Sequence, residues 1–345
     1  NVAPVGVAYV DDSAQQSYEA MVNLLIPEVT QHEVFVADLF ANNWWGIEGH
    51  HFAKHAIESA LWDVHAKRQG ESLASVLGGV TDVVEVGAGP GTLARGIFDA
   101  QPQCLSAMKY VAVEISESQR AMHPDFVESA EEFPDRMIQG VVLANELLDN
   151  LPFKLFVFDG TWKEAFVGLG DGGRFVEVLR TVNNIPEVLP ASAPLGSRAP
   201  IQEAVARWML DVTRKLSRGK VLVFDYCSES TSEIAVTPWR EWLRTYKIHE
   251  RGEHYLLEPG SQDITSQVIV DQLMMAVQAL SVTQQSEWLH KWGIDELVSE
   301  GSRYWEEHKS SPGVAAMKMR SRANEAQALS SLDGLGAFSV LELNF

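Results

Sequence analysis

The sequence predicts a doubly wound α/β fold, in which helices cover both faces of a mostly parallel sheet. From residue 81 onward, short apolar segments alternate with segments of helical periodicity. The apolar segments are nearly continuous runs rich in Val, Leu and Ala, as in parallel strands that are buried on both faces. The first of them leads into a glycine turn that opens a helix, which is where such folds bind their ligands.

The chain is expected to divide near residue 80. Residues 1–79 read as a small, mostly helical segment with a helix over about 49–69, which Gly70 ends. In this helix Ile57, Ala60, Leu61 and Val64 recur at steps of three and four, so one face is buried. Residues 80–345 then form the α/β domain.

The elements of this domain follow in order. Strands are expected at residues 81–86 and 109–115, and a third begins at residue 140 and runs into a polar loop. Residues 154–179 read as paired strands, because Asp159-Gly160 and Asp171-Gly172-Gly173 are turn sequences. A helix over 201–216 and a strand ending at Asp225 follow. We expect the Trp-rich residues 238–324 to form a helical insertion or lid, and residues 336–345 to form the last strand.

Composition limits the classes of partner. The chain has 27 Lys and Arg against 47 Asp and Glu, a net charge of −20, which disfavours binding to nucleic acid or to an anionic membrane surface. This charge suits a small-molecule substrate or a basic protein partner. No apolar run approaches the roughly 18 residues that span a bilayer. The two cysteines, Cys104 and Cys227, lie far apart, so the chain is predicted to be cytoplasmic and reduced. Oligomeric state is not readable from the sequence.

The most informative motif is Glu85-Val86-Gly87-Ala88-Gly89-Pro90-Gly91, directly after the first strand. Glycines permit backbone angles and close approaches that a Cβ would forbid, so such a turn can present backbone N–H groups to a ligand at the carboxyl edge of the sheet. A dinucleotide site would have the spacing GxGxxG, with a pyrophosphate on the helix N-terminus. Here the spacing is GxGxG after an acid, which favours a ligand with a cationic centre and no phosphate.

Two further groups of polar residues end later strands. Glu114 ends the second strand, where a carboxylate can accept both hydrogen bonds of a ribose diol. The run from Ala144 to Pro152 places Asn145, Glu146 and Asp149 at the end of the third strand. Together the three elements indicate S-adenosylmethionine rather than NAD as the cofactor.

Structural roles are the alternatives for each of these residues. The glycine turn could be a plain strand-to-helix connection, Glu114 a solvated acid, and Asn145, Glu146 and Asp149 helix caps. Asp225 and Asp263 are equally open between site and capping roles. His51 and His55 have a spacing that can hold zinc, but no third ligand is evident, and no metal site is predicted.

Several of these segments together resemble the MidA-type S-adenosylmethionine-dependent methyltransferases, a family that includes a mitochondrial complex I assembly factor that methylates an arginine of a partner subunit. The segments are VVEVGAGPGTLA, YVAVE, VVLANELLDNLPF, VFDY, WLRTYKIHERGEHYLLEPGSQDIT and GLGAFSVLE. The resemblance implies a Rossmann-like, seven-stranded class I methyltransferase sheet with a helical insertion on the substrate side. It implies a cofactor site made by Glu85, Gly87, Ala88, Gly89, Gly91, Glu114, Ile115 and Asn145, with Glu146 near the methyl donor.

The first residues resemble a different family. GHHFAKHAIESALWDVHAKRQGESLASVLGG is similar to the capping-domain helix of enolase-superfamily enzymes such as o-succinylbenzoate synthase and dipeptide epimerases. Those enzymes do their chemistry on a following (β/α) barrel, whereas here the methyltransferase-like strand begins almost at once. The chain is therefore interpreted as a fusion of a cap fragment and a methyltransferase.

The leading hypothesis is methyl transfer from S-adenosylmethionine, with the arginine of a basic protein as the acceptor implied by the resemblance. A guanidinium is charged and a poor nucleophile, so a carboxylate must orient it and accept a proton. Glu146 is the candidate for that role, with Asp149 or Asp263 in support. The alternatives are a catalytically silent methyltransferase-fold scaffold that binds a protein partner, and an enolase-superfamily fragment.

Overall fold

A computed structural model describes residues 82–102, 104–247 and 250–345. The chain divides into two compact units, one of Asn1–Thr81 with Ala100–Lys109 and the other of Asp82–Asp99 with Tyr110–Phe345. The predicted N-terminal segment, with its helix and its histidines, lies outside the described residues. All ten candidate cofactor and catalytic residues lie in the second unit.

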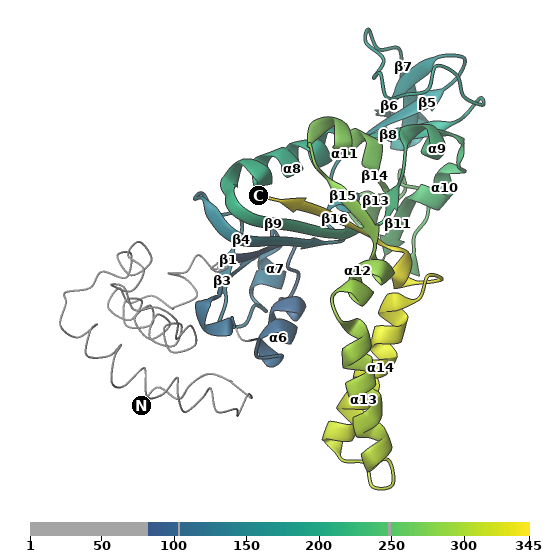
Figure 1. The fold of residues 1–345 in the computed structure, drawn as a ribbon. Coiled ribbons are helices and arrows are strands. Elements are labelled where there is room, and N and C mark those ends of the chain that lie inside the picture. Colours follow the sequence, from purple (N-terminus) through teal and green to yellow (C-terminus); the bar gives the residue numbers. More distant parts are fainter. Residues whose placement is uncertain (1–81, 103, 248–249) are drawn as a thin grey trace, which may run out of the picture. The chain divides into compact units, whose positions relative to one another are not determined.

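A seven-stranded sheet forms the centre of this unit, with the strand order β15-β16-β9-β4-β1-β2-β3 (Figure 1). The order confirms the expected doubly wound sheet. Strand β4 pairs in parallel with β1 and with β9, and β2 pairs in parallel with β3. Strand β16 runs antiparallel to β9, and β15 antiparallel to β16. The strands are β1 (Asp82–Val86), β2 (Lys109–Val113), β3 (Glu128–Ala130), β4 (Ile138–Asn145), β9 (Leu216–Asp225), β15 (Ser281–Gln284) and β16 (Ser339–Asn344).

Apolar side chains of the central strands make the main core. Val84, Val111, Val142 and Val223 are fully buried, which is why these strands read as unbroken apolar runs rather than alternating ones. Gly140, early in β4, is also fixed by packing. A Cβ on it would lie 1.9 Å from the main-chain oxygen of Asp82 on β1, so only glycine lets these two strands meet there.

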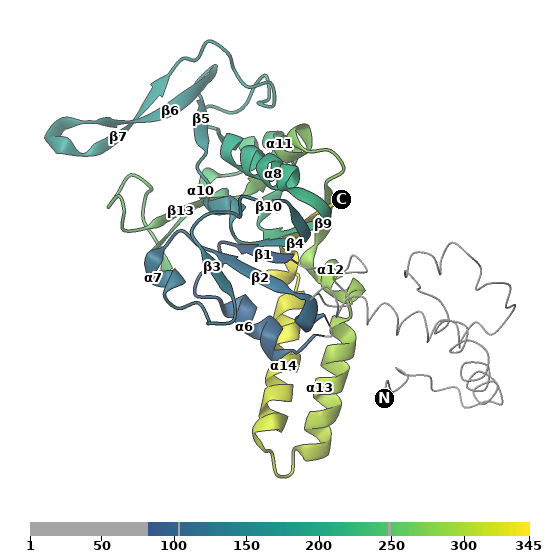
Figure 2. The same ribbon diagram turned by 90° about the vertical axis from the view of Figure 1, so that its left-hand side faces the viewer.

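Helices cover the sheet on both faces, as Figures 1 and 2 show for α8 and α11 on one side and α6 and α12 on the other. Helix α8 buries Val205, Met209 and Val212, which recur at helical spacing, as predicted for 201–216. The helices are α6 (Thr92–Asp99), α7 (Glu117–Arg120), α8 (Glu203–Lys215), α9 (Thr231–Val236), α10 (Trp239–Trp242), α11 (Val270–Ala276), α12 (Gln285–Lys291), α13 (Ile294–His308) and α14 (Val314–Ser330). The short 3-10 turns are Leu105–Ala107, Leu148–Asn150 (η4), Asp171–Gly173 and Leu335–Ala337.

A separate antiparallel sheet, in the order β7-β6-β5-β8, is inserted between β4 and β9. Its strands are β5 (Lys154–Phe158), β6 (Trp162–Leu169), β7 (Phe175–Arg180) and β8 (Arg198–Ile201). The hairpins turn at the two Asp-Gly sequences, as predicted from the turn residues. Phe156 and Trp162 of this sheet are buried in a second hydrophobic core, which they share with Trp242 and Ile269 from later elements.

Residues 238–324, expected to form a helical insertion, contain helices α10, α11, α12, α13 and most of α14, but also short strands. Helices α13 and α14 form a long antiparallel hairpin that projects from the sheet (Figure 1). Between α10 and α11, the chain forms β11 (Leu243–Lys247), β12 (Glu250–Arg251) and β13 (Asp263–Ser266) in one small sheet, and β14 (Val268–Ile269) beside β10 (Cys227–Ser228). Thr245 and Ile264 are β-branched and pair across β11 and β13. Local periodicity gives no information on a partner strand that lies about twenty residues further along the sequence.

Within the part of the chain that the structure describes, no helix is both long enough and apolar enough to cross a membrane.

Candidate functional site

The glycine turn leaves β1 in a conformation that suits glycine at three positions. Gly87, Gly89 and Gly91 have φ values of +74°, +54° and +79°. A Cβ on Gly87 would lie 3.2 Å from Leu147 Cδ1, and one on Gly91 would lie 3.0 Å from Pro124 Cδ. On Gly89, by contrast, a Cβ would meet no atom of the described residues within 4 Å. The turn is therefore tightly packed at both ends and open at its middle glycine.

The N–H groups of this turn are already paired inside the protein. Gly87 and Ala88 both donate to the carbonyl oxygen of Val113, at 2.9 and 3.0 Å, and Gly91 donates to that of Ala88 at 3.0 Å. The expectation that these N–H groups face a ligand is therefore wrong for Gly87, Ala88 and Gly91, and the Gly89 N–H likewise donates within the protein, to Glu114 Oε2. Their hydrogen bonds instead fix the shape of the turn against the end of β2, which leaves space rather than donors for a ligand.

Glu114 lies directly beside the turn, as the sequence predicted. Its Oε2 accepts the Gly89 N–H at 2.9 Å, and its Oε1 accepts the Ser116 N–H at 2.9 Å. Each carboxylate oxygen has a second lone pair that can still accept a hydrogen bond. The carboxylate is thus held in one orientation by two backbone groups and retains the capacity to accept both hydroxyls of a diol.

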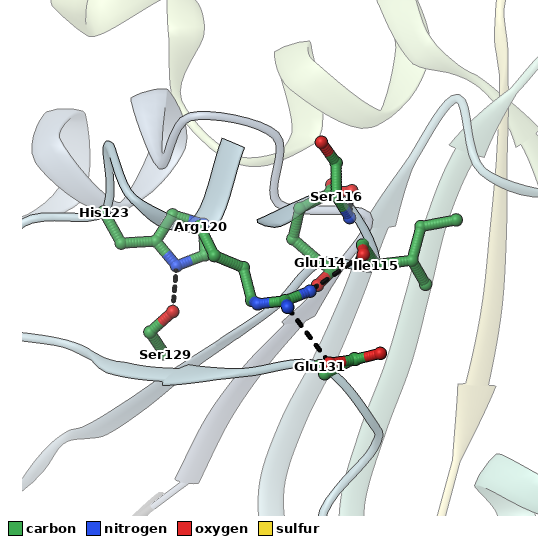
Figure 3. A network of polar contacts seen from close by, with 7 residues as sticks. All are labelled: Glu114, Ile115, Ser116, Arg120, His123, Ser129 and Glu131. Atoms are coloured by element: carbon green, nitrogen blue, oxygen red, sulfur yellow. Dashed lines mark hydrogen bonds and ion pairs between the residues drawn. The ribbon is translucent and has the colours of Figure 1, made fainter. Parts of the chain in front are cut away.

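Arg120 fixes the segment that carries this carboxylate (Figure 3). Its Nη1 donates to the carbonyl oxygens of Glu114 and Ile115, at 2.7 and 2.8 Å, and its Nη2 pairs with Glu131 at 3.0 Å. Sequence reasoning missed this residue. The available signal is an arginine on the short helix that follows the strand-end acid, where its side chain can reach back to the preceding carbonyls.

His123 fixes the glycine turn in the same way. Its Nε2 lies 2.9 Å from the carbonyl oxygen of Gly89, and its Nδ1 lies 2.8 Å from Ser129 Oγ (Figure 3). Because a carbonyl only accepts, Nε2 carries the hydrogen, and Nδ1 then accepts from the Ser129 hydroxyl when the ring is neutral. This residue was also missed, because its two partners belong to separate segments, the glycine turn and β3.

Ile115 and Glu85 differ sharply in exposure. The Ile115 side chain is 84% exposed next to Glu114, which leaves an apolar surface free for the flat face of a base. Glu85 is only 6% exposed and accepts the Tyr110 hydroxyl at 2.7 Å. Burial raises the pKa of Glu85, and the hydrogen bond from Tyr110 opposes that rise. Glu85 therefore joins β1 to β2 beneath the turn, and a contact with a ligand remains a prediction for it.

The second group of predicted residues follows β4. Asn145 and Glu146 are exposed, and Asn145 Nδ2 donates to Glu146 Oε1 at 3.3 Å. Glu146 has φ +48°, an uncommon value for a residue with a side chain, and its N–H donates to the carbonyl of Phe224 at 2.8 Å. Strained backbone of this kind is concentrated at functional sites, and here it fixes the direction of the Glu146 side chain at the sheet edge.

Asp149 and Asp225 form a pair of buried acids behind this edge. Asp149 is 5% exposed and Asp225 is fully buried at the end of β9. Asp225 Oδ2 accepts the N–H groups of Leu148 and Asp149, at 2.9 and 3.3 Å, and its Oδ1 accepts that of Tyr226 at 2.8 Å. Burial, together with the negative charge of Glu146, raises the pKa of Asp149 to about 6. Burial and the Asp149 carboxylate likewise raise the pKa of Asp225.

The two groups of residues meet at one edge of the sheet. Strands β1 and β4 are neighbours, and Val86 pairs with Ala144, so Gly87 and Asn145 are the next residues on adjacent strand ends. Asp263, the other acid considered from the sequence, is exposed at the start of β13, and no described hydrogen bond joins it to the pair. Among the residues that the structure describes, no group of three His, Cys, Asp or Glu side chains is placed to hold a metal ion.

Comparison with known proteins gives the family. A family model described as "Putative S-adenosyl-L-methionine-dependent methyltransferase" matches residues 69–286, which is more than half of the chain. The chain belongs to this family. The resemblance to MidA-type methyltransferases is thereby confirmed, and S-adenosyl-L-methionine is the cofactor of the family.

Two solved structures have the fold of this methyltransferase. One is a protein from Burkholderia thailandensis, described as a "likely methyl transferase" and bound to S-adenosyl-homocysteine. The match has a TM-score of 0.66 and 21% identity, and it covers 98% of this chain and 95% of that one. Another protein from the same organism matches with a TM-score of 0.65 and 23% identity, and the match covers 100% of this chain and 95% of that one. At these identities the likeness shows the fold alone.

The N-terminal segment matches a second family. The N-terminal domain of mandelate racemase and muconate lactonizing enzymes matches residues 4–78. An o-succinylbenzoate synthase from Bacillus subtilis is 32% identical over 79 residues, which are 23% of this chain and 21% of that protein. One from Geobacillus stearothermophilus is 28% identical over 83 residues, which are 24% of this chain and 22% of that protein. The chain spans about a fifth of the length of these curated relatives. The two family matches, one to each part of the chain, thus support the predicted fusion.

The residues at the sheet edge fit the cofactor of this methyltransferase family. Glu114 offers two fixed oxygens suited to a ribose diol, Ile115 an apolar surface, and Gly89 an open approach that a Cβ would fill. Asn145 and Glu146 lie at the neighbouring strand end, where the sequence predicted the methyl donor. The individual roles of these residues remain predictions.

Proposed function

We propose that this methyltransferase transfers the methyl group of S-adenosyl-L-methionine to the guanidinium of an arginine in a basic protein, and that Glu146 and Asp149 are its catalytic residues. The observation that carries the proposal is the acidic edge formed by an exposed carboxylate on Glu146 and a buried one on Asp149. The net charge of −20 is suited to a basic acceptor.

The sulfonium supplies an electrophilic methyl group, so the protein must align and prepare the acceptor. Glu146, held by its Phe224 contact, would orient the guanidinium and localise its positive charge on the far nitrogens. The attacking nitrogen forms its bond to the methyl carbon as the bond from carbon to sulfur breaks. That nitrogen loses one proton overall, since the acceptor keeps a single positive charge.

Asp149 is suited to accept that proton. Burial raises its pKa to about 6, so at neutral pH the group is ionised yet more basic than an ordinary carboxylate. The buried Asp225 holds the Asp149 backbone in place through its N–H. A proton on Asp149 also removes the repulsion between this carboxylate and Glu146, which favours the protonated product state.

The test measures binding and transfer separately. Glu146→Gln is expected to abolish transfer of a radiolabelled methyl group into a set of basic proteins, while the Kd for S-adenosyl-homocysteine by calorimetry stays within a few-fold. Acid hydrolysis of the labelled proteins then identifies the methylated residue, and methylarginine is expected. Label on another residue would refute the arginine acceptor. Cofactor binding without transfer to any acceptor by the wild type would favour the silent scaffold.

A further inference from the structure

Three arginines gather around one hollow beside the candidate site. The hollow has a volume of about 480 Å³ and is lined by Arg240, Arg244 and Arg251 together with the aromatic side chains of Trp239 and Tyr255. It is formed by helix α10 and strands β11 and β12, and Arg244, Arg251 and Tyr255 belong to the WLRTYKIHERGEHY stretch that the sequence singled out. Nothing in the proposed methyl transfer uses this cluster.

The three guanidinium groups have no carboxylate partner in the described part of the chain. Ion pairs there join carboxylates to other arginines, such as Arg120 and Arg198, but none reaches Arg240, Arg244 or Arg251. The chain carries 47 acidic residues against 27 basic ones, so carboxylates are plentiful. Three adjacent unpaired cations repel one another, and such a cluster is stabilised when an anion binds.

The guanidinium groups are held by other means. Arg244 Nε donates to the carbonyl of Glu241 at 2.8 Å, and Arg251 Nη2 donates to the carbonyl of Arg240. Arg240 lies over the Trp239 ring, with Cζ 4.8 Å from its centroid. These contacts orient the side chains and leave most of their N–H donors without a protein acceptor. A planar fork of such donors is the preferred partner of carboxylate and phosphate groups.

Arg244 links this hollow to the candidate catalytic edge. Its Cζ lies 5.4 Å from the ring of Tyr226, the residue that follows the buried Asp225. Its positive charge also reaches Asp149, where it opposes the effect of burial on the pKa of that carboxyl. An acceptor at the sheet edge can therefore place a neighbouring group of its own against Arg244.

We propose that Arg240, Arg244 and Arg251 form an oxyanion subsite that binds a carboxylate or phosphate carried by the methyl acceptor. The inference rests on the proposed function in that the acceptor must approach over β4 and β9. It adds a requirement to the acceptor, which would carry an anionic group near the methylated cation. Glu241 and Glu253 share the wall of the hollow, so they repel an anion that is not directly bonded to the arginines.

Direct anion binding tests the subsite without any methyl transfer. Inorganic phosphate and acetate are titrated separately into the full chain at low ionic strength, with calorimetric detection. Wild type is expected to saturate, and Arg244→Met and Arg251→Met are each expected to weaken the Kd about tenfold, because each removes charge-assisted hydrogen bonds. Glu241→Gln is expected to tighten binding. A Kd for phosphate more than about tenfold lower than that for acetate identifies a phosphate subsite. Two Kd values within about tenfold of each other identify a carboxylate subsite.

The control variant is Arg174→Met. Arg174 is an exposed arginine in the β6–β7 turn without a described partner, and its loss is expected to leave anion binding unchanged. Binding of S-adenosyl-homocysteine is measured on every variant, since an unchanged Kd shows an intact fold. Absence of saturable anion binding by the wild type, or an equal loss in Arg174→Met, would overturn the subsite. Loss of the proposed arginine methylation alone would leave these binding results as they are.

Discussion

Glu114→Gln is the sharpest test of the cofactor site. In the wild type each carboxylate oxygen accepts one backbone N–H, from Gly89 and from Ser116, both at 2.9 Å. An amide keeps only one acceptor oxygen, so its NH2 group must face one of these two donors. The same substitution removes the negative charge and one of the two acceptors that we assign to the ribose diol.

The size of the effect follows from the strength of the lost contacts. A hydrogen bond to a charged group contributes about 1.5–3 kcal/mol. Loss of one such bond to the ribose corresponds to a Kd for S-adenosyl-homocysteine that is about 10- to 150-fold weaker, at about 1.4 kcal/mol for each factor of ten. Disturbance of the Gly89 contact adds to this loss, because the same carboxylate supports the open part of the glycine turn.

Isothermal titration with S-adenosyl-homocysteine measures the change. The matched control is Glu117→Gln, an exposed acid in the first turn of α7, which is expected to bind like the wild type. A thermal melt of each variant separates a change in binding from a loss of folded protein. If Glu114→Gln binds within threefold of the wild type, Glu114 does not hold the ribose, and the assignment of this edge as the cofactor site is wrong.

Five other substitutions, at four residues, test the remaining features of the site. Glu146→Gly removes the strain of a side chain at φ +48° and is expected to abolish transfer while raising stability by about 0.5–1 kcal/mol in a denaturant titration, whereas Glu146→Ala should abolish transfer without that gain. Because Asp149 must be ionised to accept a proton, kcat/KM is expected to rise with pH through about 6, while stability falls as pH rises above about 4, because burial raises the pKa of both Asp149 and Asp225. Asp149→Asn should make this fall smaller, since it removes one ionising group and the charge that raises the pKa of Asp225, and an unchanged profile would contradict the raised pKa of Asp149. Gly87→Val is expected to weaken binding of S-adenosyl-homocysteine and lower the melting temperature, because φ is +74° and the new Cβ meets Leu147 Cδ1 at 3.2 Å; calorimetry with an unaltered Kd would remove the turn from the site. Arg120→Met should raise the KM for S-adenosyl-L-methionine with little change in kcat, because the Glu114 main chain loses the hydrogen bond that holds it. A fall in kcat with an unchanged KM would indicate a different role.

The sequence alone determined the central elements and the strand-end residues. TDVVEV followed by GAGPG is a local pattern, and it was enough to place β1, the turn and α6. Glu114 and Asn145 could be assigned to strand ends because parallel strands are continuous apolar runs that stop at the first polar residue. Since such ends meet at one edge of a doubly wound sheet, the nearness of Gly89 and Glu114 was also predictable.

Only the tertiary structure decided which side chains support these residues. Arg120 and His123 act through the carbonyls of Glu114 and Gly89. Because every residue has a main-chain carbonyl, the sequence does not indicate which of them accepts such a hydrogen bond. Asp225 was open between site and capping roles until its contacts with the Leu148 and Asp149 N–H groups, more than seventy residues away, placed it beneath the acidic edge. The β11–β13 pairing was missed for the same reason. Contacts between distant segments form only when the chain packs, because packing energy rather than local periodicity selects the partner.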